Sequence, residues 1–207
     1  MKLEARNLSC VRGNKKLFRN LSFSLSEGEL LWVQGQNGAG KSSFLKILTG
    51  LLTPEKGGIF WQDKAVLTQE TDYKQAFGFL GHQHGLKRNL TIEENISYHL
   101  ALTGKPIKKV NEKQPNLLSR FQLSDVRNFF PHQLSAGQQR KAALISLMLK
   151  EPTIWVLDEP FTALDMNSQM LLNTLMREHL FAGGMIVMAS HINLDGDHRQ
   201  KIIQIPC

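Results

Sequence analysis

The 207-residue chain has little cysteine and no long apolar run, and each shortage excludes a class of protein. Its two cysteines, Cys10 and Cys207, stand near opposite ends without metal-ligand spacing, which argues against a disulfide framework and predicts reduced thiols. The longest apolar runs, "ELLWV", "TIWVL" and "MIVMA", are far shorter than the roughly 18 residues of a membrane span. The opening "MKLEARNLSC" lacks the apolar core of a signal peptide, so we expect a cytoplasmic location.

The composition is that of an ordinary globular protein with a basic balance. Hydrophobic residues make up 42% and charged residues 21% of the chain, and the formal net charge is +7. Such a charge would suit nucleic acid or an anionic membrane surface. The charges are scattered, however, with only short clusters such as "KPIKK". The charge therefore selects no partner, while the length suits one domain with a small lobe.

Apolar periodicity predicts an α/β fold that begins with antiparallel strands. Apolar residues stand two apart in "KLEARNLS" and "NLSFSLS", as in half-buried strands. The run "ELLWVQG" then predicts a buried strand, followed by the helical spacing of "KSSFLKILTGLL". Later, "TIWVLD" and "GGMIVMAS" are short and wholly apolar, with the helical "SQMLLNTLMREHL" between them. This last pattern predicts a β-α-β unit with buried parallel strands.

The middle of the chain, about residues 83–149, has a helical pattern and predicts a helical subdomain inserted into the single domain. Thr91 and Glu94 in "LTIEENISYHLAL" have the spacing of a capping box, and Ser135 and Gln138 repeat that spacing. Between them, the prolines and charges of "KPIKKVNEKQP" predict an interruption of the helical pattern.

The stretch "GQNGAGKSS" matches the phosphate-binding pattern G-x-x-x-x-G-K-[ST] between a predicted strand and a predicted helix. Its glycines let backbone N–H groups close around phosphate oxygens, and Lys41 brings a positive charge to the β and γ phosphates. The Ser42 hydroxyl is a ligand for Mg²⁺. The predicted nucleotide-binding residues are Gly35, Gln36, Asn37, Gly38, Ala39, Gly40, Lys41, Ser42 and Ser43.

Two carboxylates, Asp158 and Glu159, follow the predicted buried strand in "IWVLDEP". Carboxylates at the end of a buried strand are costly unless they serve a cation or a reaction. Asp158 suits the Mg²⁺ of a phosphate-binding loop, and Glu159 could orient or deprotonate an attacking water. Together with the loop, the pair predicts hydrolysis of a nucleoside triphosphate.

A second glycine turn, "QLSAGQQRKAAL", is followed some twenty residues later by "IWVLDEP" and then by "ALD". This combination resembles the ATP-binding cassette family, in which the signature turn of one subunit caps the γ-phosphate held by the P-loop of another. The resemblance implies a homodimer with composite sites across a two-fold interface. The signature residues acting in trans would be Leu134, Ser135, Ala136, Gly137 and Gln138.

The same resemblance implies roles for three further residues. Gln83 in "GHQHG" is expected to contact Mg²⁺, the attacking water and a membrane partner. Asp165 in "ALD" is expected at the dimer interface, and His191 in "ASHIN" is expected to contact the γ-phosphate. His82 and His84 flank Gln83, but a His-x-His without a carboxylate or cysteine partner is a weak metal site, so we leave both out.

The chain departs from the family pattern where an aromatic residue normally stacks on adenine. "CVRGNKKLF" has Arg12 at that position. A guanidinium plane also stacks on bases, so Arg12 is one candidate for the adenine contact and Phe18 is a second.

Within the family, "WVQGQNGAGKSS", "LSAGQQRKAAL" and "WVLDEPFTALD" resemble the ATPase subunits of the haem exporters of cytochrome c maturation. That resemblance implies ATP and Mg²⁺ as ligands and an integral membrane permease, of the CcmB type, at the cytoplasmic face of the inner membrane. Hydrolysis would drive haem delivery or release of the haem chaperone.

Two alternatives stay open, the ATPase of another small bacterial exporter and a cassette that acts on nucleic acid or ribosomes. The second would need a coiled-coil insertion or a second cassette. Between Lys41 and Asp158 there are no sustained heptads, and the chain has one cassette. It also lacks a stripe of basic and aromatic residues, so we expect no nucleic-acid partner.

Overall fold

The computed structural model describes residues 1–66, 70–83, 85–102, 107–192, 194 and 198–205, which divide into two compact units. The first unit comprises Met1–Gly81, Thr153–Pro160 and Met176–Cys207, and the second comprises His82–Pro152 and Phe161–Leu175. Cys207, His84 and the beginning of "KPIKKVNEKQP" lie outside the described residues.

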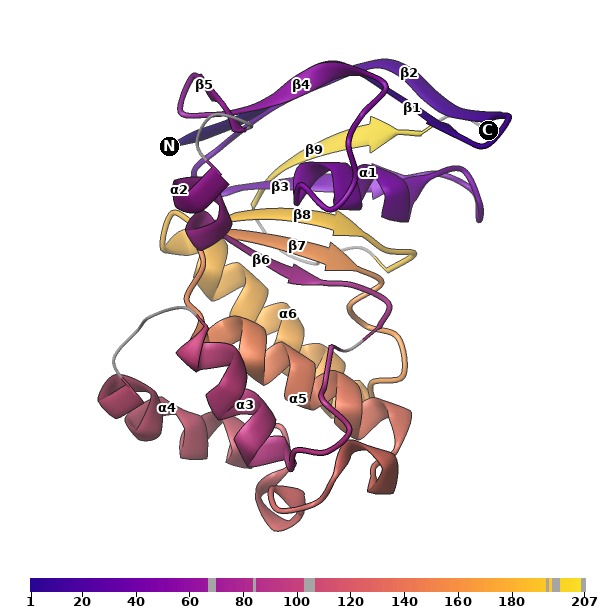
Figure 1. Ribbon diagram of the computed structural model, residues 1–207. Coiled ribbons are helices and arrows are strands. Elements are labelled where there is room, and N and C mark those ends of the chain that lie inside the picture. The colour runs from indigo at the N-terminus through magenta and orange to yellow at the C-terminus, as the bar shows by residue number, and fades with distance from the viewer. Residues whose placement is uncertain (67–69, 84, 103–106, 193, 195–197, 206–207) are drawn as a thin grey trace. The chain divides into compact units, whose positions relative to one another are not determined.

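The elements are labelled in Figure 1. The strands are β1 (Lys2–Arg12), β2 (Lys15–Ser26), β3 (Glu29–Gln34), β4 (Lys56–Trp61), β5 (Lys64–Ala65), β6 (Phe77–Leu80), β7 (Ile154–Asp158), β8 (Met185–Ala189) and β9 (Arg199–Gln204). The helices are α1 (Lys41–Leu48), α2 (Glu70–Ala76), α3 (Ile92–Ala101), α4 (Ile107–Arg120), α5 (Ala136–Leu149) and α6 (Met166–Phe181), with 3₁₀ turns at Ser124–Val126 and Pro131–Gln133.

An antiparallel sheet with the strand order β2-β1-β4-β5 opens the first unit. The alternation seen in the sequence places Leu3 opposite Leu25 and Leu8 opposite Leu21, and all four side chains are buried. The predicted antiparallel strands are thereby confirmed. They supply one wall of the hydrophobic core.

A parallel sheet with the order β6-β7-β8-β3-β9 forms the rest of the first unit's β structure. Every residue of β7 and β8 is buried, and the two strands pair in parallel, which confirms the predicted β-α-β unit. The neighbouring strands β7, β8 and β3 have their carboxyl ends at one edge of the sheet. Loops at that edge of an open α/β sheet are where ligands bind.

Helix α1 joins the two sheets through the core of the first unit (Figure 1). Phe44 of α1 is fully buried and meets the rings of Phe18 and Phe23 edge-on, with centroids 5.9 and 5.8 Å away. On its other side, α1 contacts β7 and β8. The helix that follows the phosphate-binding loop is therefore fixed by apolar packing on both sides.

The second unit consists of α3, α4, α5 and the first part of α6. The interruption predicted in "KPIKKVNEKQP" is wrong at Pro115, because helix α4 runs through this proline without ending. Leu118 and Phe121, which follow the proline, are buried, and α4 contacts both α3 and α5. This packing outweighs the loss of one backbone hydrogen bond at the proline.

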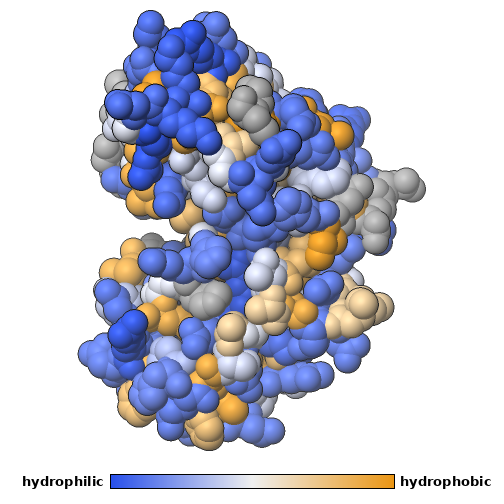
Figure 2. Space-filling model, turned by 90° about the vertical axis from the view of Figure 1, so that its right-hand side faces the viewer, coloured by the Kyte–Doolittle hydropathy of each residue, from blue (hydrophilic) through white to orange (hydrophobic). Residues whose placement is uncertain are grey.

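One face of the protein is largely polar. Hydrophilic side chains predominate on the face drawn in Figure 2, where apolar groups are small and separated. Each helix within the described ranges falls short of the length or the hydropathy that a membrane span requires.

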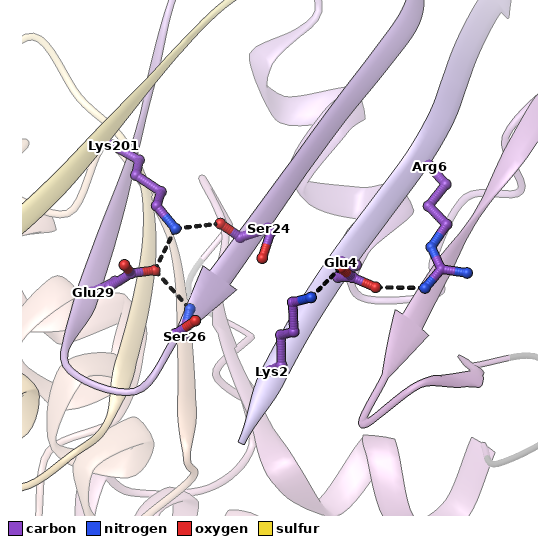
Figure 3. Close-up of polar contacts among 7 residues, drawn as sticks. All are labelled: Lys2, Glu4, Arg6, Ser24, Ser26, Glu29 and Lys201. Carbon is purple, nitrogen blue, oxygen red and sulfur yellow. Dashed lines mark hydrogen bonds and ion pairs between the residues drawn. The ribbon is translucent and has the colours of Figure 1, made fainter.

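A buried carboxylate fastens the turn that leads into β3 (Figure 3). Glu29 Oε2 accepts hydrogen bonds from the Ser26 N–H at 2.7 Å and from Lys201 Nζ at 2.6 Å, and Lys201 also donates to the Ser24 carbonyl. Burial alone would raise the pKa of Glu29, but the bonds from Lys201 and Ser26 outweigh it and lower the pKa. The carboxylate thus links β9 to both ends of the β2–β3 turn.

Glu29→Gln should lower the free energy of unfolding at pH 7 by about 1–2 kcal/mol, since a charge-assisted pair is lost and the 42% exposed side chain of Lys201 is partly screened. Because the folded-state pKa lies below the unfolded one, this stabilisation is present above the unfolded pKa and lost as the pH falls through the folded pKa. Urea unfolding at pH 7 and at acidic pH measures the gap, which is the difference in the free energy of unfolding between the parent and the variant. Glu178→Gln, an exposed carboxylate of the same unit, is the control; a gap that stays equal at both pH values contradicts the assignment.

Candidate functional site

The phosphate-binding loop connects β3 to α1 in the first unit. Gly40, the N-cap of α1, has φ 114°, and a Cβ there would lie 3.0 Å from the Leu17 Cβ. Glycine is therefore required both by the left-handed backbone and by the approach of β2. Immediately after it, Lys41 begins the helix, whose N-terminal N–H groups are a ready site for phosphate.

Lys41 is held inside this loop. Its ammonium donates to the Gly35 carbonyl at 2.7 Å and lies 3.4 Å from the Gln36 carbonyl, and the residue is only 9% exposed. Gln36, Asn37 and Gly38 are exposed. A positive charge thus lies within a loop whose outer residues are open to a phosphate chain.

Two oxygen ligands suited to Mg²⁺ belong to the same unit. Asp158 is the last residue of β7 and is 5% exposed, and Ser42 lies in the first turn of α1, which packs against β7. A carboxylate and a hydroxyl are the hard donors that Mg²⁺ prefers, so these residues fit the ion. Gln83 is an exposed residue of the second unit, and its role toward Mg²⁺ stays a prediction.

Glu159 and His191 are brought together at the carboxyl ends of β7 and β8. The His191 Nε2 lies 3.6 Å from Glu159 Oε1. Glu159 has a left-handed backbone, with φ 48°, and its N–H donates to the Ala189 carbonyl at 2.8 Å. A non-glycine residue in this conformation is strained and has to be held by its surroundings. The hydrogen bond to β8 provides that restraint.

Trp32 was missed by the sequence reasoning, although it holds the segment that carries His191. Its indole N–H donates to the Ser190 carbonyl at 2.8 Å, and the Ser190 hydroxyl accepts the Ile192 N–H at 3.0 Å. The Glu159 N–H donates to the carbonyl of Ala189, the residue before Ser190. The end of β8 is therefore held from the β7 side by Glu159 and from the β3 side by Trp32. Nothing local in the sequence signals a contact across 158 positions.

The signature turn begins α5 in the second unit with the predicted capping box. Ser135 Oγ accepts the Gln138 N–H at 3.1 Å, and Gln138 Oε1 accepts the Ser135 N–H at 2.9 Å. A Cβ on Gly137 would lie 2.5 Å from the Ala163 carbonyl oxygen. Only glycine lets this turn approach the segment that precedes α6. Leu134 is buried, whereas Ser135 and Ala136 are exposed.

Asp165 makes two contacts within its own chain. Its Oδ1 accepts the Ser168 N–H at 2.9 Å, as an N-cap side chain does, and its Oδ2 lies 2.6 Å from Lys141 Nζ. The Lys141 hydrogen bond, followed by that from Ser168, holds the pKa of Asp165 well below its usual range. The carboxylate stays ionised and half exposed.

A cavity of about 580 Å³ lies wholly in the second unit. It is lined by Gln83, Gly85, Leu86, Arg88, Pro131, His132 and Gln139. The Gln139 side chain also donates to the Pro131 and Leu134 carbonyls, at 2.9 and 3.2 Å, which fixes the wall formed by residues 131–134. Gln83, a predicted site residue, therefore lines a cavity that also contains the basic side chain of Arg88.

The two candidates for the adenine contact differ in exposure, and the role of Arg12 stays a prediction. Phe18 is 3% exposed and packs against Phe44 in the core, so its ring has no free face for a base. Arg12 is exposed at the end of β1, opposite Lys15 of β2.

Comparison with known proteins identifies the family of this chain. The family model described as ABC transporter matches residues 18–162. The chain therefore belongs to the ATP-binding cassette family, and its α/β fold is that of the family's ATPase domains. A solved "ATP binding subunit of ABC transporter" matches with a TM-score of 0.84 and 27% identity, covering 92% of this chain and 80% of that one.

Two curated relatives carry the same name, cytochrome c biogenesis ATP-binding export protein CcmA. The one from Photobacterium profundum is 37% identical over 97% of this chain and 98% of its own length. The one from Nitrosomonas europaea is 39% identical over 93% of this chain and 89% of its own length. The similarity thus spans nearly the whole of each protein.

Trp32→Phe should lower the ATPase turnover number about two- to tenfold and leave ATP affinity unchanged, because it removes only the N–H that fixes the Ser190 carbonyl. Trp155→Phe is the matched control, since the buried indole N–H of Trp155 has no hydrogen-bond partner among the described residues. Steady-state ATPase assays and equilibrium nucleotide titrations measure the two quantities. Equal losses in the two variants would show that the Trp32 hydrogen bond has no special role.

Proposed function

We propose that this protein is the ATP-hydrolysing subunit of the haem exporter of cytochrome c maturation, coupling ATP hydrolysis to haem delivery or to release of the haem chaperone. The observation that carries hydrolysis is the meeting of Glu159 and His191, 3.6 Å apart, at the sheet edge where the Lys41 loop also begins. The relatives named for cytochrome c biogenesis and export support the choice of exporter.

The reaction that fits this site is transfer of the γ-phosphoryl group to water. Bound Mg²⁺ would neutralise charge on the β and γ phosphates, with Ser42 and Asp158 as its protein ligands. Lys41 and the N–H groups of the loop hold the phosphate chain. Water attacks the γ-phosphorus, Glu159 accepts the water's proton, and the bond from the γ-phosphorus to the bridging oxygen breaks to leave ADP and phosphate. His191, which faces Glu159, contacts the γ-phosphate.

In this proposal two copies of the chain form the working unit. The Ser135 side chain satisfies one backbone N–H of the first turn of α5, and the helix end carries a partial positive charge. Ser135 and Ala136 are exposed, as a turn that caps a partner's phosphate has to be. Each site would combine the P-loop of one copy with the signature turn of the other.

The cavity of the second unit is the proposed contact for an integral membrane permease of the CcmB type, which would hold the protein at the cytoplasmic face of the inner membrane. Arg88 and His132 give the cavity a basic lining, and Phe129 and Phe130 beside it are large exposed apolar side chains. A mixed basic and aromatic surface suits a polar cytoplasmic segment of a partner protein. Gln83 in the lining would connect that contact to the nucleotide.

Glu159→Gln should abolish ATP turnover and preserve ATP binding, since it keeps the size of the side chain and removes the base. Lys41→Ala should instead weaken ATP binding, because the charge inside the loop is lost. ATPase assays and nucleotide titrations of both variants in the reconstituted transporter separate the two effects. Parental turnover in Glu159→Gln would refute the role given to Glu159.

Arg88→Glu should reduce the amount of membrane subunit that copurifies with this protein from native membranes, because it reverses a charge in the cavity lining. Arg120→Glu, an exposed position on α4 that does not line the cavity, serves as the control. Identification of the copurified subunit by mass spectrometry tests the exporter assignment. A permease unrelated to cytochrome c maturation would redirect the proposal to another exporter.

A further inference from the structure

Lys141 is a buried cation on α5, next to the buried Arg140 and at the start of an apolar stretch of the helix. It is 7% exposed, and the residues that follow it, Ala142, Ala143 and Leu144, are buried as well. Removing an ammonium group from water is costly unless a partner of opposite charge compensates. The position therefore calls for an explanation that hydrophobic packing does not provide.

The partner is Asp165, on the segment that precedes α6. Lys141 Nζ lies 2.6 Å from Asp165 Oδ2, while the other carboxylate oxygen caps α6 through the Ser168 N–H. One side chain thus binds the signature helix and the following helix together. The Asp165 side chain is 52% exposed, so the same carboxylate also reaches the surface.

A second contact joins the same two segments one helical turn away. Gly137 and Lys141 are four residues apart on α5 and so lie on one face of the helix. At Gly137 the helix meets the carbonyl of Ala163, so closely that a Cβ would come to 2.5 Å. Ala163 itself has a left-handed backbone with φ 63°, a conformation that neighbouring contacts must maintain.

Stability gives no reason to prefer this ion pair to an apolar contact. Replacing a buried ion pair by well-packed apolar residues of similar volume is often neutral or stabilising. Where such pairs are retained, they can fix one arrangement of the elements that they join. Here the joined elements are the signature turn and the Asp165 segment, which the proposed dimer presents to the partner copy.

We infer that Lys141 is a positioning residue that locks the signature turn to the Asp165 segment, so that the two meet the partner copy's nucleotide as one rigid block. The inference rests on the proposed composite site. In this arrangement the Asp165 carboxylate pairs with Lys141 of its own chain. The exposed part of the Asp165 segment remains available to the partner copy. Lys141 touches no substrate in this arrangement and acts only through the turn.

The test is Lys141→Met, which keeps the length and apolar stem of the side chain and removes the charge. In the reconstituted transporter the turnover number should fall about tenfold or more, because the signature turn loses its fixed position. ATP affinity of the P-loop should stay within about twofold, since that loop belongs to the other unit of the chain. The thermal midpoint should change little, because the remaining Asp165 carboxylate is 52% exposed and still accepts the Ser168 N–H. A lysine that served stability alone would lower the midpoint together with the turnover number.

Asp165→Asn tests the same pair from the other side, since the amide oxygen can still cap Ser168 while the charge is lost. If the ion pair is the working unit, the double variant should be no slower than the slower single variant. Multiplying losses would show two independent effects and overturn the inference. Lys150→Met, at the other end of α5, is the control for replacing a lysine on this helix.

A crosslink separates failure of this inference from failure of the composite site. Ser42→Cys and Ser135→Cys are combined with Glu159→Gln, in a chain whose Cys10 and Cys207 are replaced by serine. With ATP, the parent should form a crosslink between two chains, and Lys141→Met should reduce its yield severalfold. A parent that crosslinks only within single chains refutes the composite site, whereas equal yields in parent and Lys141→Met overturn the lock alone.

Discussion

The convergence of parallel strands at one sheet edge is the constraint on which the reactive site depends. β3, β7 and β8 are neighbours, and each ends in a functional group or is followed by one. β3 leads into the phosphate-binding loop, β7 ends in Asp158 and is followed by Glu159, and β8 is followed by Ser190 and His191. Because β7 and β8 are fully buried and β3 is mostly buried, tight packing fixes the positions of the groups at their ends.

Three of the buried charged side chains in the described part of the chain show how such charges are compensated. Lys41 is held by loop carbonyls, Glu29 by a lysine and a backbone N–H, and Lys141 by a carboxylate. At Glu29 the pair fastens a turn between strands. At Lys41 the partners are neutral carbonyls, which a phosphate would outcompete as a partner for the ammonium. A buried charge held only by dipoles is ready for a ligand, whereas one held by an opposite charge is committed to structure.

What the sequence could predict follows from the range of the interactions. The P-loop and the capping boxes at Thr91 and Ser135 are local, since each is completed within a few residues, and the structure contains both boxes. The buried strands were equally clear, because continuous apolar runs leave few other interpretations. β9 was missed, because its sequence "RQKIIQ" contains only two apolar residues and its pairing with β3 is distant in sequence. The interruption predicted at Pro115 was wrong, because the burial of Leu118 and Phe121 stabilises the helix more than the low helix propensity of proline weakens it.

The contacts that position the reactive groups are the ones that no local pattern reveals. Trp32 and Ser190 are 158 residues apart, and Lys141 and Asp165 are 24 apart on different elements. The Trp32 contact holds the backbone beside the motif residue His191, and the Lys141 contact holds the side chain of the motif residue Asp165. A motif can therefore be recognised by its letters, while the accuracy with which it is held depends on residues such as these. The rates of Trp32→Phe and Lys141→Met measure that accuracy directly, since neither residue is expected to touch the nucleotide.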